Sequence, residues 1–599
     1  MEFHPLFTQL QFGYNDESSS NGLSGAQSSL VHKLHKDHSG GLFLLPSVLA
    51  QNSTSTSPIL SPKIDIFIQD LMKEWGTPGG VSVAVVRLGS SEEWQVETKG
   101  YGVAKLQDGT NFTADTLLSM CSNSKLFDVV ATGLLMSNES VTPKINWATK
   151  IASVIPEWKI MDSYASEKAS IIDLMSHRTG LPRHEFMFRR GDTIPSMTWQ
   201  YTNHMYNVLA YLPEVLSTKT TLARYVKQHV FDALGMNAST YSFDVANASG
   251  NLADGIAREN FDATAGLPGT GTPRFMPHRL KVGGEDVMSG SCGVISSAND
   301  MAIWLQTLLL RGKHPQTGEQ VIPAEVLGIL ASGVTVEIPS PQQSVLSPTV
   351  YGGAQTANSY QGHYVVEHDG DLWGAHTTVS RLPFDNLGVA VLTNDEDVGP
   401  SIRAIIKYRI IDEALGLEPY DWNSFYKNQL PGGVAPADNS SLPQNTSDPS
   451  IEVTRLAGTY NNPGYGNWTF CLISEETTGS CRESVANAST HLPGFIDPTV
   501  PILVAKLDAV LTDYVLLMHS DGNEFDGFLL ISNPTNDSEQ PFWAKSLGSF
   551  KAEFASTDDG IGMAISGNFW GATPGLPEPT GDSVRERAEV WFSQVAPSA

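Results

Sequence analysis

The stretch Leu117–Met136, LLSMCSNSKLFDVVATGLLM, decides both the fold and the chemistry that we predict for this chain. It contains Ser122-Asn-Ser-Lys125, a serine and a lysine three positions apart. After Lys125, apolar residues recur at helical spacing, which predicts a core helix. These apolar residues are Leu126, Val129, Val130 and Leu134. Because residues three apart on a helix share one face, Ser122 on the first turn is predicted to face Lys125 on the next.

A facing serine and lysine are suited to acyl transfer. A serine hydroxyl is a poor nucleophile until a nearby group takes its proton. For Lys125 to be that group, its pKa must fall through burial or a neighbouring cation. Free amide groups at the start of the helix could stabilise a developing oxyanion. Tyr201, in Tyr201-Thr-Asn203, is the natural third member, because a phenol near an ammonium can relay protons.

Each short motif also has an ordinary structural interpretation. Ser122 could be a helix cap beside a solvated lysine, Tyr201 a loop residue before a helix, and His368-Asp-Gly370 a turn between strands. A second copy of the spacing, Ser424-Phe-Tyr-Lys427, opens no apolar helix and is interpreted as a coincidence. The order of the three motifs along the chain, each in a fitting local context, favours the acyl-transfer site.

The set of motifs resembles the serine β-lactamase and penicillin-binding-protein superfamily, especially its class C-like branch of esterases, D-aminopeptidases and transesterases. Ser-x-x-Lys is that superfamily's acylation motif, Tyr-x-Asn is its second, and a strand-borne Lys-Thr-Gly or His-x-Gly its third. The stretches Ile171–Pro182 and Ser291–Trp304 resemble its flanking segments. The resemblance extends over roughly residues 62 to 420.

The resemblance implies the catalytic roles. Ser122 would be the acylated nucleophile, Lys125 its activating partner and Tyr201 the proton relay. Asn203 would hydrogen-bond the acyl side of the substrate and help to hold Lys125.

It also implies the substrate-binding residues of the third motif. His368 would line the site. The oxyanion hole would comprise the backbone amides of Ser122 and Asp371, and Gly370 would allow the backbone to approach the substrate closely.

The chain departs from the superfamily pattern in two places. His368-Asp-Gly370 replaces Lys-Thr-Gly, and a largely neutral histidine beside an aspartate suits a substrate carboxylate poorly. True β-lactamase activity is therefore not favoured. In addition, only 24 residue steps separate His177 from Tyr201, where relatives usually have a longer insertion. This predicts either a more open pocket or a shortened gene model, and both leave the substrate's size open.

Bulk composition excludes several other classes of function. At 599 residues the chain is long enough for more than one domain. Its net charge of −27 disfavours nucleic acids and anionic membrane surfaces as partners. The charge argues neither for nor against ester or amide substrates. No apolar run reaches the length of a membrane span. No zinc spacing or nucleotide loop occurs, and the serine mechanism needs no metal or other cofactor. The oligomeric state is left open.

The four cysteines and the sequons bear on the compartment. Four cysteines permit two bridges. Cys471 and Cys481 could form a hairpin-closing disulfide, whereas Cys121 and Cys292 are predicted to be small buried packing residues rather than a second bridge. Ten Asn-x-Ser/Thr sequons hint at a secretory or extracellular protein. The first residues do not resemble a signal peptide, although Gly41–Ala50 could be a displaced apolar region, so a cytoplasmic location stays open.

Composition shifts suggest four regions. Residues 1–60 are predicted to be disordered or mobile, 61–425 to form the β-lactamase/transpeptidase-like domain, 426–450 to be a linker, and 451–599 to form a small all-β barrel. The first folded domain is predicted to be α+β, an antiparallel sheet flanked by helices. The last resembles the lipocalin-like domain attached to some serine peptidases of this superfamily, with its aromatic residues predicted to be core.

The leading functional prediction is a serine hydrolase that forms an acyl-enzyme on Ser122 and acts on small esters or peptide-like amides. An acyltransferase of secondary metabolism that passes the same acyl group to an alcohol is the first alternative. A non-catalytic binding protein on the same scaffold is the second.

Overall fold

The computed structural model describes residues 57–160, 163–187, 200–217, 219–280, 288–430, 447–474, 479–497, 499–572 and 577–595. The predictions for the N-terminal segment as far as residue 56, for the Gly41–Ala50 region and for most of the linker lie outside these residues. In the described parts of the chain, no helix is both long and apolar enough to cross a membrane.

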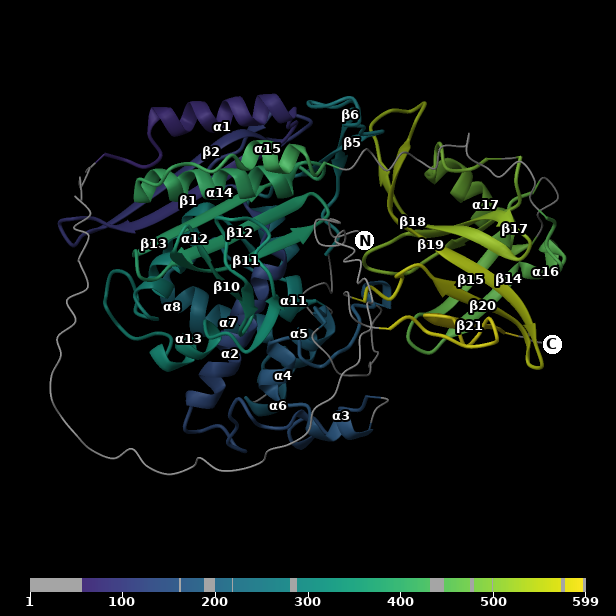
Figure 1. Ribbon diagram of the computed structural model, residues 1–599, viewed down its shortest axis with the longest axis horizontal. Coiled ribbons are helices and arrows are strands. Elements are labelled where there is room, and N and C mark those ends of the chain that lie inside the picture. Colours follow the sequence, from purple (N-terminus) through teal and green to yellow (C-terminus); the bar gives the residue numbers. More distant parts are fainter. Residues whose placement is uncertain are drawn as a thin grey trace, which may run out of the picture. The chain divides into compact units, whose positions relative to one another are not determined.

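The first folded region is built on an antiparallel sheet (Figure 1). Its strand order over the described residues is β3-β2-β1-β13-β12-β11-β10-β9-β8. The strands of this sheet are β1 (Gly80–Leu88), β2 (Trp94–Lys105), β3 (Thr110–Asn111), β8 (Thr335–Ile338), β9 (Thr349–Tyr351), β10 (Thr356–Tyr360), β11 (His363–Leu372), β12 (Ala375–Leu382) and β13 (Leu387–Thr393). Strands distant in sequence are thus neighbours, since β1 pairs with β13 from Val81↔Thr393 to Arg87↔Leu387.

Helices cover both faces of this sheet. The helices of the region are α1 (Pro62–Trp75), α2 (Ser124–Ser137), α3 (Ser163–Lys168), α4 (Ile171–Met175), α5 (Asn203–Leu209), α6 (Leu212–Leu216), α7 (Leu222–Val226), α8 (Asp232–Leu234), α9 (Phe243–Ala248), α11 (Ser289–Cys292), α12 (Ala298–Leu309), α13 (Ala324–Leu330), α14 (Gly399–Leu415) and α15 (Trp422–Lys427). Short strands β4 (Leu118–Ser119) and β7 (Ile295–Ser296) pair beside the nucleophile segment, and β5 (Gly255–Glu259) pairs with β6 (Thr272–Met276).

Alternate side chains of β1 pack into two buried clusters, one on each face of the sheet. Val81, Val83 and Val85 share one buried cluster with residues of α1, α14 and α15. Ala84 and Val86 lie in a second cluster with residues of α2 and α12, because successive strand residues point to opposite faces. Figure 1 shows α1, α14 and α15 together over one face of the sheet. The predicted α+β arrangement is confirmed.

The C-terminal region is a closed antiparallel barrel, in which the described strands follow one another from β14 to β21 (Figure 1). The strands are β14 (Gly458–Asn462), β15 (Gly466–Leu472), β16 (Ile502–Lys506), β17 (Tyr514–Asp521), β18 (Glu524–Pro534), β19 (Phe542–Thr557), β20 (Gly560–Ser566) and β21 (Val590–Gln594), with helices α16 (Val453–Leu456) and α17 (Ser480–His491). Buried aromatic rings fill its core, as predicted; they include Tyr460, Tyr465, Trp468, Phe470, Phe525, Phe554, Phe569 and Phe592.

The cysteine predictions are confirmed with one correction. Cys471 and Cys481 form a disulfide, but it joins the end of β15 to α17 and does not close a hairpin. Cys481 lies on the helix α17 and not on a strand paired with β15, so the two cysteines do not face each other across a hairpin. Cys121 and Cys292 are free and buried.

Candidate active site

Ser122 lies at the start of the buried core helix, in a 3-10 turn, Cys121–Asn123, that leads into α2. The predicted helix therefore begins just after this turn, at Ser124. Cys121, immediately before Ser122, has φ +51°, a left-handed conformation that a non-glycine residue seldom adopts. Strain of this kind persists only where the surrounding structure imposes it, and it is common at functional sites.

Lys125 is fully buried and reaches back to Ser122. Its Nζ lies 3.0 Å from Ser122 Oγ, 2.6 Å from Asn203 Oδ1 and 3.0 Å from the carbonyl oxygen of Ser291. The amide and backbone oxygens can only accept hydrogen bonds. A neutral amine would give its two protons to them, and its lone pair would then point at the Ser122 hydroxyl.

The protonation states of Lys125 and Tyr201 differ for the same physical reason. Burial lowers the pKa of Lys125 to about 7, so the neutral amine is well populated near neutral pH. Burial also raises the pKa of the Tyr201 phenol well above its usual value, despite the hydrogen bond to Ser122. Lys125 is therefore the better proton acceptor of the two, and Tyr201 carries its proton.

Tyr201 and Asn203 lie at the N-terminal end of α5. The Tyr201 hydroxyl donates to Ser122 Oγ at 2.7 Å, and Asn203 Nδ2 donates to Glu185 Oε1 at 3.2 Å. The buried His177 ring lies 4.4 Å from the Tyr201 ring and accepts a hydrogen bond from the Thr202 amide at 3.1 Å. Burial lowers the pKa of His177, which keeps the ring neutral.

The short segment before Tyr201 is described only at its two ends, because residues 188–199 lie outside the described residues. The ends meet directly: the Gln200 amide donates to the His177 carbonyl at 2.9 Å. The two predictions made for this segment, an open pocket or a shortened gene model, stay untested.

His368 lies on β11, with its ring 6.2 Å from that of Tyr201. Its Nδ1 donates to the Asp369 carbonyl, so Nε2 accepts from the Tyr351 hydroxyl at 3.1 Å. Burial and the nearby Lys125 lower the pKa of His368 to about 4. The ring is therefore neutral at pH 7, and the third motif brings no fixed cation to the site.

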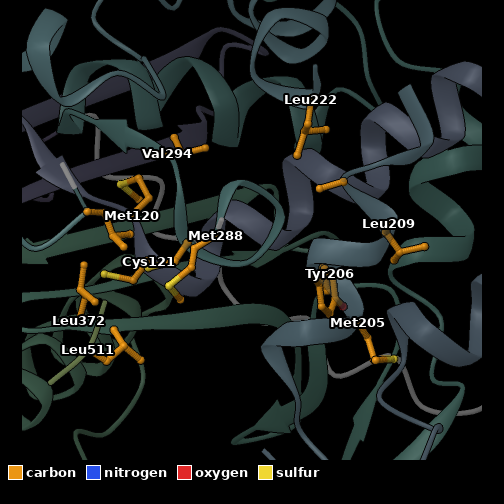
Figure 2. Close-up of a cluster of buried hydrophobic side chains, with 14 of the residues drawn as sticks. Met120, Cys121, Met205, Tyr206, Leu209, Leu222, Met288, Val294, Leu372 and Leu511 are labelled. Carbon is orange, nitrogen blue, oxygen red and sulfur yellow. The ribbon is translucent and has the colours of Figure 1, made fainter. Parts of the chain in front are cut away.

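Gly370 brings β11 against the nucleophile segment. A Cβ at this position would lie 2.3 Å from the carbonyl oxygen of Met120 and 3.1 Å from Cys121 Cβ. The close approach is thus to the chain's own backbone, whereas the sequence interpretation invoked only the substrate. Figure 2 shows the buried side chains of Met120, Cys121 and Leu372 gathered in this part of the core.

The carboxylate of Asp371 is held in place by hydrogen bonds. Its carboxylate receives two hydrogen bonds from Arg403, at 2.6 and 3.1 Å, and one from His376 Nδ1 at 2.6 Å. Arg403 and His376 lower the pKa of Asp371 against the effect of burial, so it is ionised.

The structure therefore brings the three predicted motifs together around Ser122. Sequence reasoning missed several side chains that support them, namely Glu185, Tyr351, His376, Thr377 and Arg403. The Thr377 hydroxyl, on β12, accepts a hydrogen bond from Asn123 Nδ2 at 2.9 Å and so ties the sheet to the nucleophile turn. Ser291 lies in one of the flanking stretches, and its role as a backbone acceptor for Lys125 has no signature in side-chain identity.

The second Ser-x-x-Lys copy is not arranged as an active site. Ser424 and Lys427 lie on the short helix α15, which the sequence interpretation did not predict. Lys427 pairs with Glu74 instead of Ser424. Among the described residues, no group of three or more His, Cys, Asp or Glu side chains could hold a metal ion.

Fold and site together define a hydrolase of the β-lactamase/transpeptidase-like superfamily. The chain belongs to the Beta-lactamase family, whose model matches residues 64–410, more than half of the chain.

Several known relatives of this chain are hydrolases. It is 29% identical over 442 residues to an unguisins hydrolase of Aspergillus campestris (strain IBT 28561), covering 68% of this chain and 77% of the relative. It is 23% identical over 398 residues to an N-acetylmuramyl-L-alanine amidase of Bacillus subtilis (strain 168), covering 59% and 85%. Among solved structures, the D-amino acid amidase of Ochrobactrum anthropi SV3 is similar at a TM-score of 0.45 and 17% identity, covering 59% of this chain and 99% of that chain.

Proposed function

We propose that this protein is a serine hydrolase that forms an acyl-enzyme on Ser122 and cleaves ester or peptide-like amide bonds. The observation that carries the proposal is the placement of Ser122 Oγ within 3.0 Å of the Lys125 amine and 2.7 Å of the Tyr201 hydroxyl. These are the distances at which a base and a proton relay act on a nucleophile.

In the acylation step, Ser122 Oγ attacks the substrate carbonyl carbon while neutral Lys125 takes the hydroxyl proton. The carbonyl oxygen becomes an oxyanion, which the backbone amides of Ser122 and Asp371 would stabilise. As the tetrahedral intermediate collapses, Tyr201 donates its proton to the leaving alcohol or amine and regains one from Lys125. Water then attacks the acyl-enzyme by the reverse proton path, releasing the acid and restoring Ser122.

The charges around the third motif favour a substrate that places no carboxylate there. His368 is neutral, and Arg403 beside the motif is already paired with Asp369 at 3.3 Å and with Asp371 at 2.6 Å. The amidase among the relatives supports amide substrates for this chain. We infer that neutral peptide-like amides and esters are better substrates than β-lactams.

Turnover of p-nitrophenyl butyrate by the wild type, Ser122→Ala and Ser424→Ala tests the proposal. We expect Ser122→Ala to lose at least about 10³-fold in kcat, because removal of a nucleophile that acts as one unit with its base abolishes that unit's contribution. Ser424→Ala, the matched control at the second copy of the motif, should keep wild-type kcat.

Equal activity of the two variants would contradict the assignment of Ser122. Adding a short alcohol separates the two enzymatic classes, since an acyltransferase would form the transesterified product and a hydrolase chiefly the acid. Amino-acid p-nitroanilides of D and L configuration, assayed alongside the ester, report directly on amide cleavage and its stereochemistry.

A further inference from the structure

A chain of charged groups runs from the C-terminal barrel into the active-site sheet. It begins at Lys545 on β19, whose Nζ lies 2.9 Å from Asp397 Oδ1 and 3.4 Å from Glu396 Oε1. Both carboxylates follow β13 of the catalytic sheet and are almost fully buried. Arg258 also faces Asp397, with its backbone amide 2.6 Å from Oδ2. Lys545 is the cation with which the barrel pairs these two carboxylates.

The chain continues through His376. Glu396 Oε2 accepts a hydrogen bond from the Gly374 amide at 2.6 Å and lies 3.6 Å from His376 Nε2. His376 Nδ1 lies 2.6 Å from Asp371 Oδ1. Burial alone would lower the pKa of His376, but Asp371 and Glu396 on either side raise it to about 9, so the ring is charged at neutral pH. The imidazolium therefore bridges the two carboxylates.

Arg403, on α14, completes the chain at the peptide between Gly370 and Asp371. It binds the Asp371 carboxylate and also donates to the Gly370 carbonyl oxygen at 2.7 Å. In a trans peptide the C=O and the following N–H point in opposite directions. Holding the Gly370 carbonyl thus fixes the direction of the Asp371 N–H, the group proposed as an oxyanion donor.

A second contact ties the barrel to the same strand end. Trp373, two residues after Asp371, donates its indole N–H to the carbonyl oxygen of Leu511 in the barrel at 3.2 Å. Figure 2 places the side chains of Leu372 and Leu511 next to each other. The barrel therefore holds the end of β11 through packing and a hydrogen bond.

We propose that Lys545 is a positioning residue for the oxyanion hole, acting from the barrel through Glu396, His376 and Asp371. This inference rests on the proposed function. Without Lys545, Glu396 and Asp397 lose a cation that they share. Glu396 would then draw the His376 imidazolium toward itself and away from Asp371, loosening the peptide whose N–H should meet the oxyanion. Oxyanion donors stabilise the transition state through geometry that is set before the reaction, so a misplaced donor should lower kcat rather than weaken substrate binding.

Lys545→Met in the full chain tests this inference, with Lys551→Met as the matched control. Lys551 lies on the same strand β19, but is exposed and pairs within the barrel, with Asp526. With p-nitrophenyl butyrate, we expect Lys545→Met to lower kcat at least tenfold with KM within about twofold of wild type. Lys551→Met should keep both constants, and Lys545→Arg, which retains the charge, should recover most of kcat.

Two further variants separate positioning from general stability. Glu396→Gln interrupts the same series of ion pairs at a residue of the catalytic region and should also lower kcat. It tests the inference even if Lys545→Met does not fold. In the double variant Lys545→Met/Asp371→Asn, the losses should be less than multiplicative, because both act on one peptide.

Equal kcat for Lys545→Met and Lys551→Met, an unchanged kcat in Glu396→Gln, or fully multiplicative losses would each overturn the inference. Ser122→Ala is assayed in parallel. If Ser122→Ala were as active as wild type, the proposed function itself would fail, and this outcome is distinct from a failure at Lys545.

Discussion

At the scale of single residues, the most informative feature is the environment of Lys125. An ordinary lysine is protonated at neutral pH and cannot accept a proton from serine. Burial of Lys125 among Ser122, Asn203 and the Ser291 carbonyl changes this, since these partners do not bring a full negative charge to the ammonium. The same burial keeps Tyr201 protonated, so the two groups can exchange roles as acceptor and donor.

The pH dependence of kcat/KM should therefore follow the deprotonation of the Lys125 amine. In the proposed mechanism the active form is the neutral amine, so kcat/KM should rise tenfold per pH unit below about 7 and level off above it. Assays of p-nitrophenyl butyrate between about pH 5.5 and 8.5, corrected for spontaneous hydrolysis, measure this. Lys125→Arg, which cannot deprotonate, should be inactive throughout. A flat wild-type profile across this range would show that another group is the base.

At the scale of elements, the site depends on how closely β11 passes the segment before Ser122. Gly370 permits that approach, because a side chain there would collide with the Met120 carbonyl. Elsewhere in the domain a glycine serves no such purpose: Gly328, inside α13, has open space where a Cβ would be placed. The two positions make a matched pair.

Gly370→Ala should push β11 away from Ser122. We expect a loss of about 1–3 kcal/mol in the free energy of unfolding, as for other overpacked sites, and a kcat at least tenfold below wild type. Gly328→Ala should instead stabilise the protein by about 0.5–1 kcal/mol, because alanine is the better helix former. Denaturant unfolding and esterase assays of both variants measure these effects. Wild-type kcat in Gly370→Ala would contradict the importance of this approach.

At the scale of the whole molecule, the barrel supplies partners to buried groups of the catalytic region. Trp543 donates to the Phe275 carbonyl at 3.2 Å, and the Phe186 and Phe569 rings stack with centroids 5.7 Å apart. The backbone amide of His184, one residue before Glu185, donates to the Trp570 carbonyl at 2.9 Å. The barrel thus contributes to the order of the segment that holds Asn203.

A chain truncated after residue 430 should therefore be less soluble than the full chain and lose at least tenfold in kcat. Removing the barrel exposes apolar surface and leaves polar groups without partners, which costs about 1–3 kcal/mol for each group that stays buried. Soluble yield, the midpoint of thermal unfolding and esterase kcat, each compared with the full chain, measure the effect. A soluble truncated protein with wild-type kcat would show that the catalytic region is independent of the barrel.

The sequence by itself determined the site's chemical groups and the fold class. Ser122, Lys125 and Tyr201 lie in short motifs whose spacing reflects local structure, and strand and helix patterns such as residues 80–86 and 401–411 follow from side-chain periodicity. Local geometry is encoded by neighbouring residues, so it can be predicted from them.

Only the tertiary structure decided what surrounds those groups. Lys125 meets the Ser291 carbonyl across 166 residues of sequence, and Lys545 meets Asp397 across 148. A backbone acceptor or a cross-domain ion pair leaves no local pattern, because any residue provides a carbonyl and many surface lysines look alike. The lowered pKa of Lys125 and the held peptide at Asp371 arise from burial and long-range contacts, and these exist only once the chain has folded.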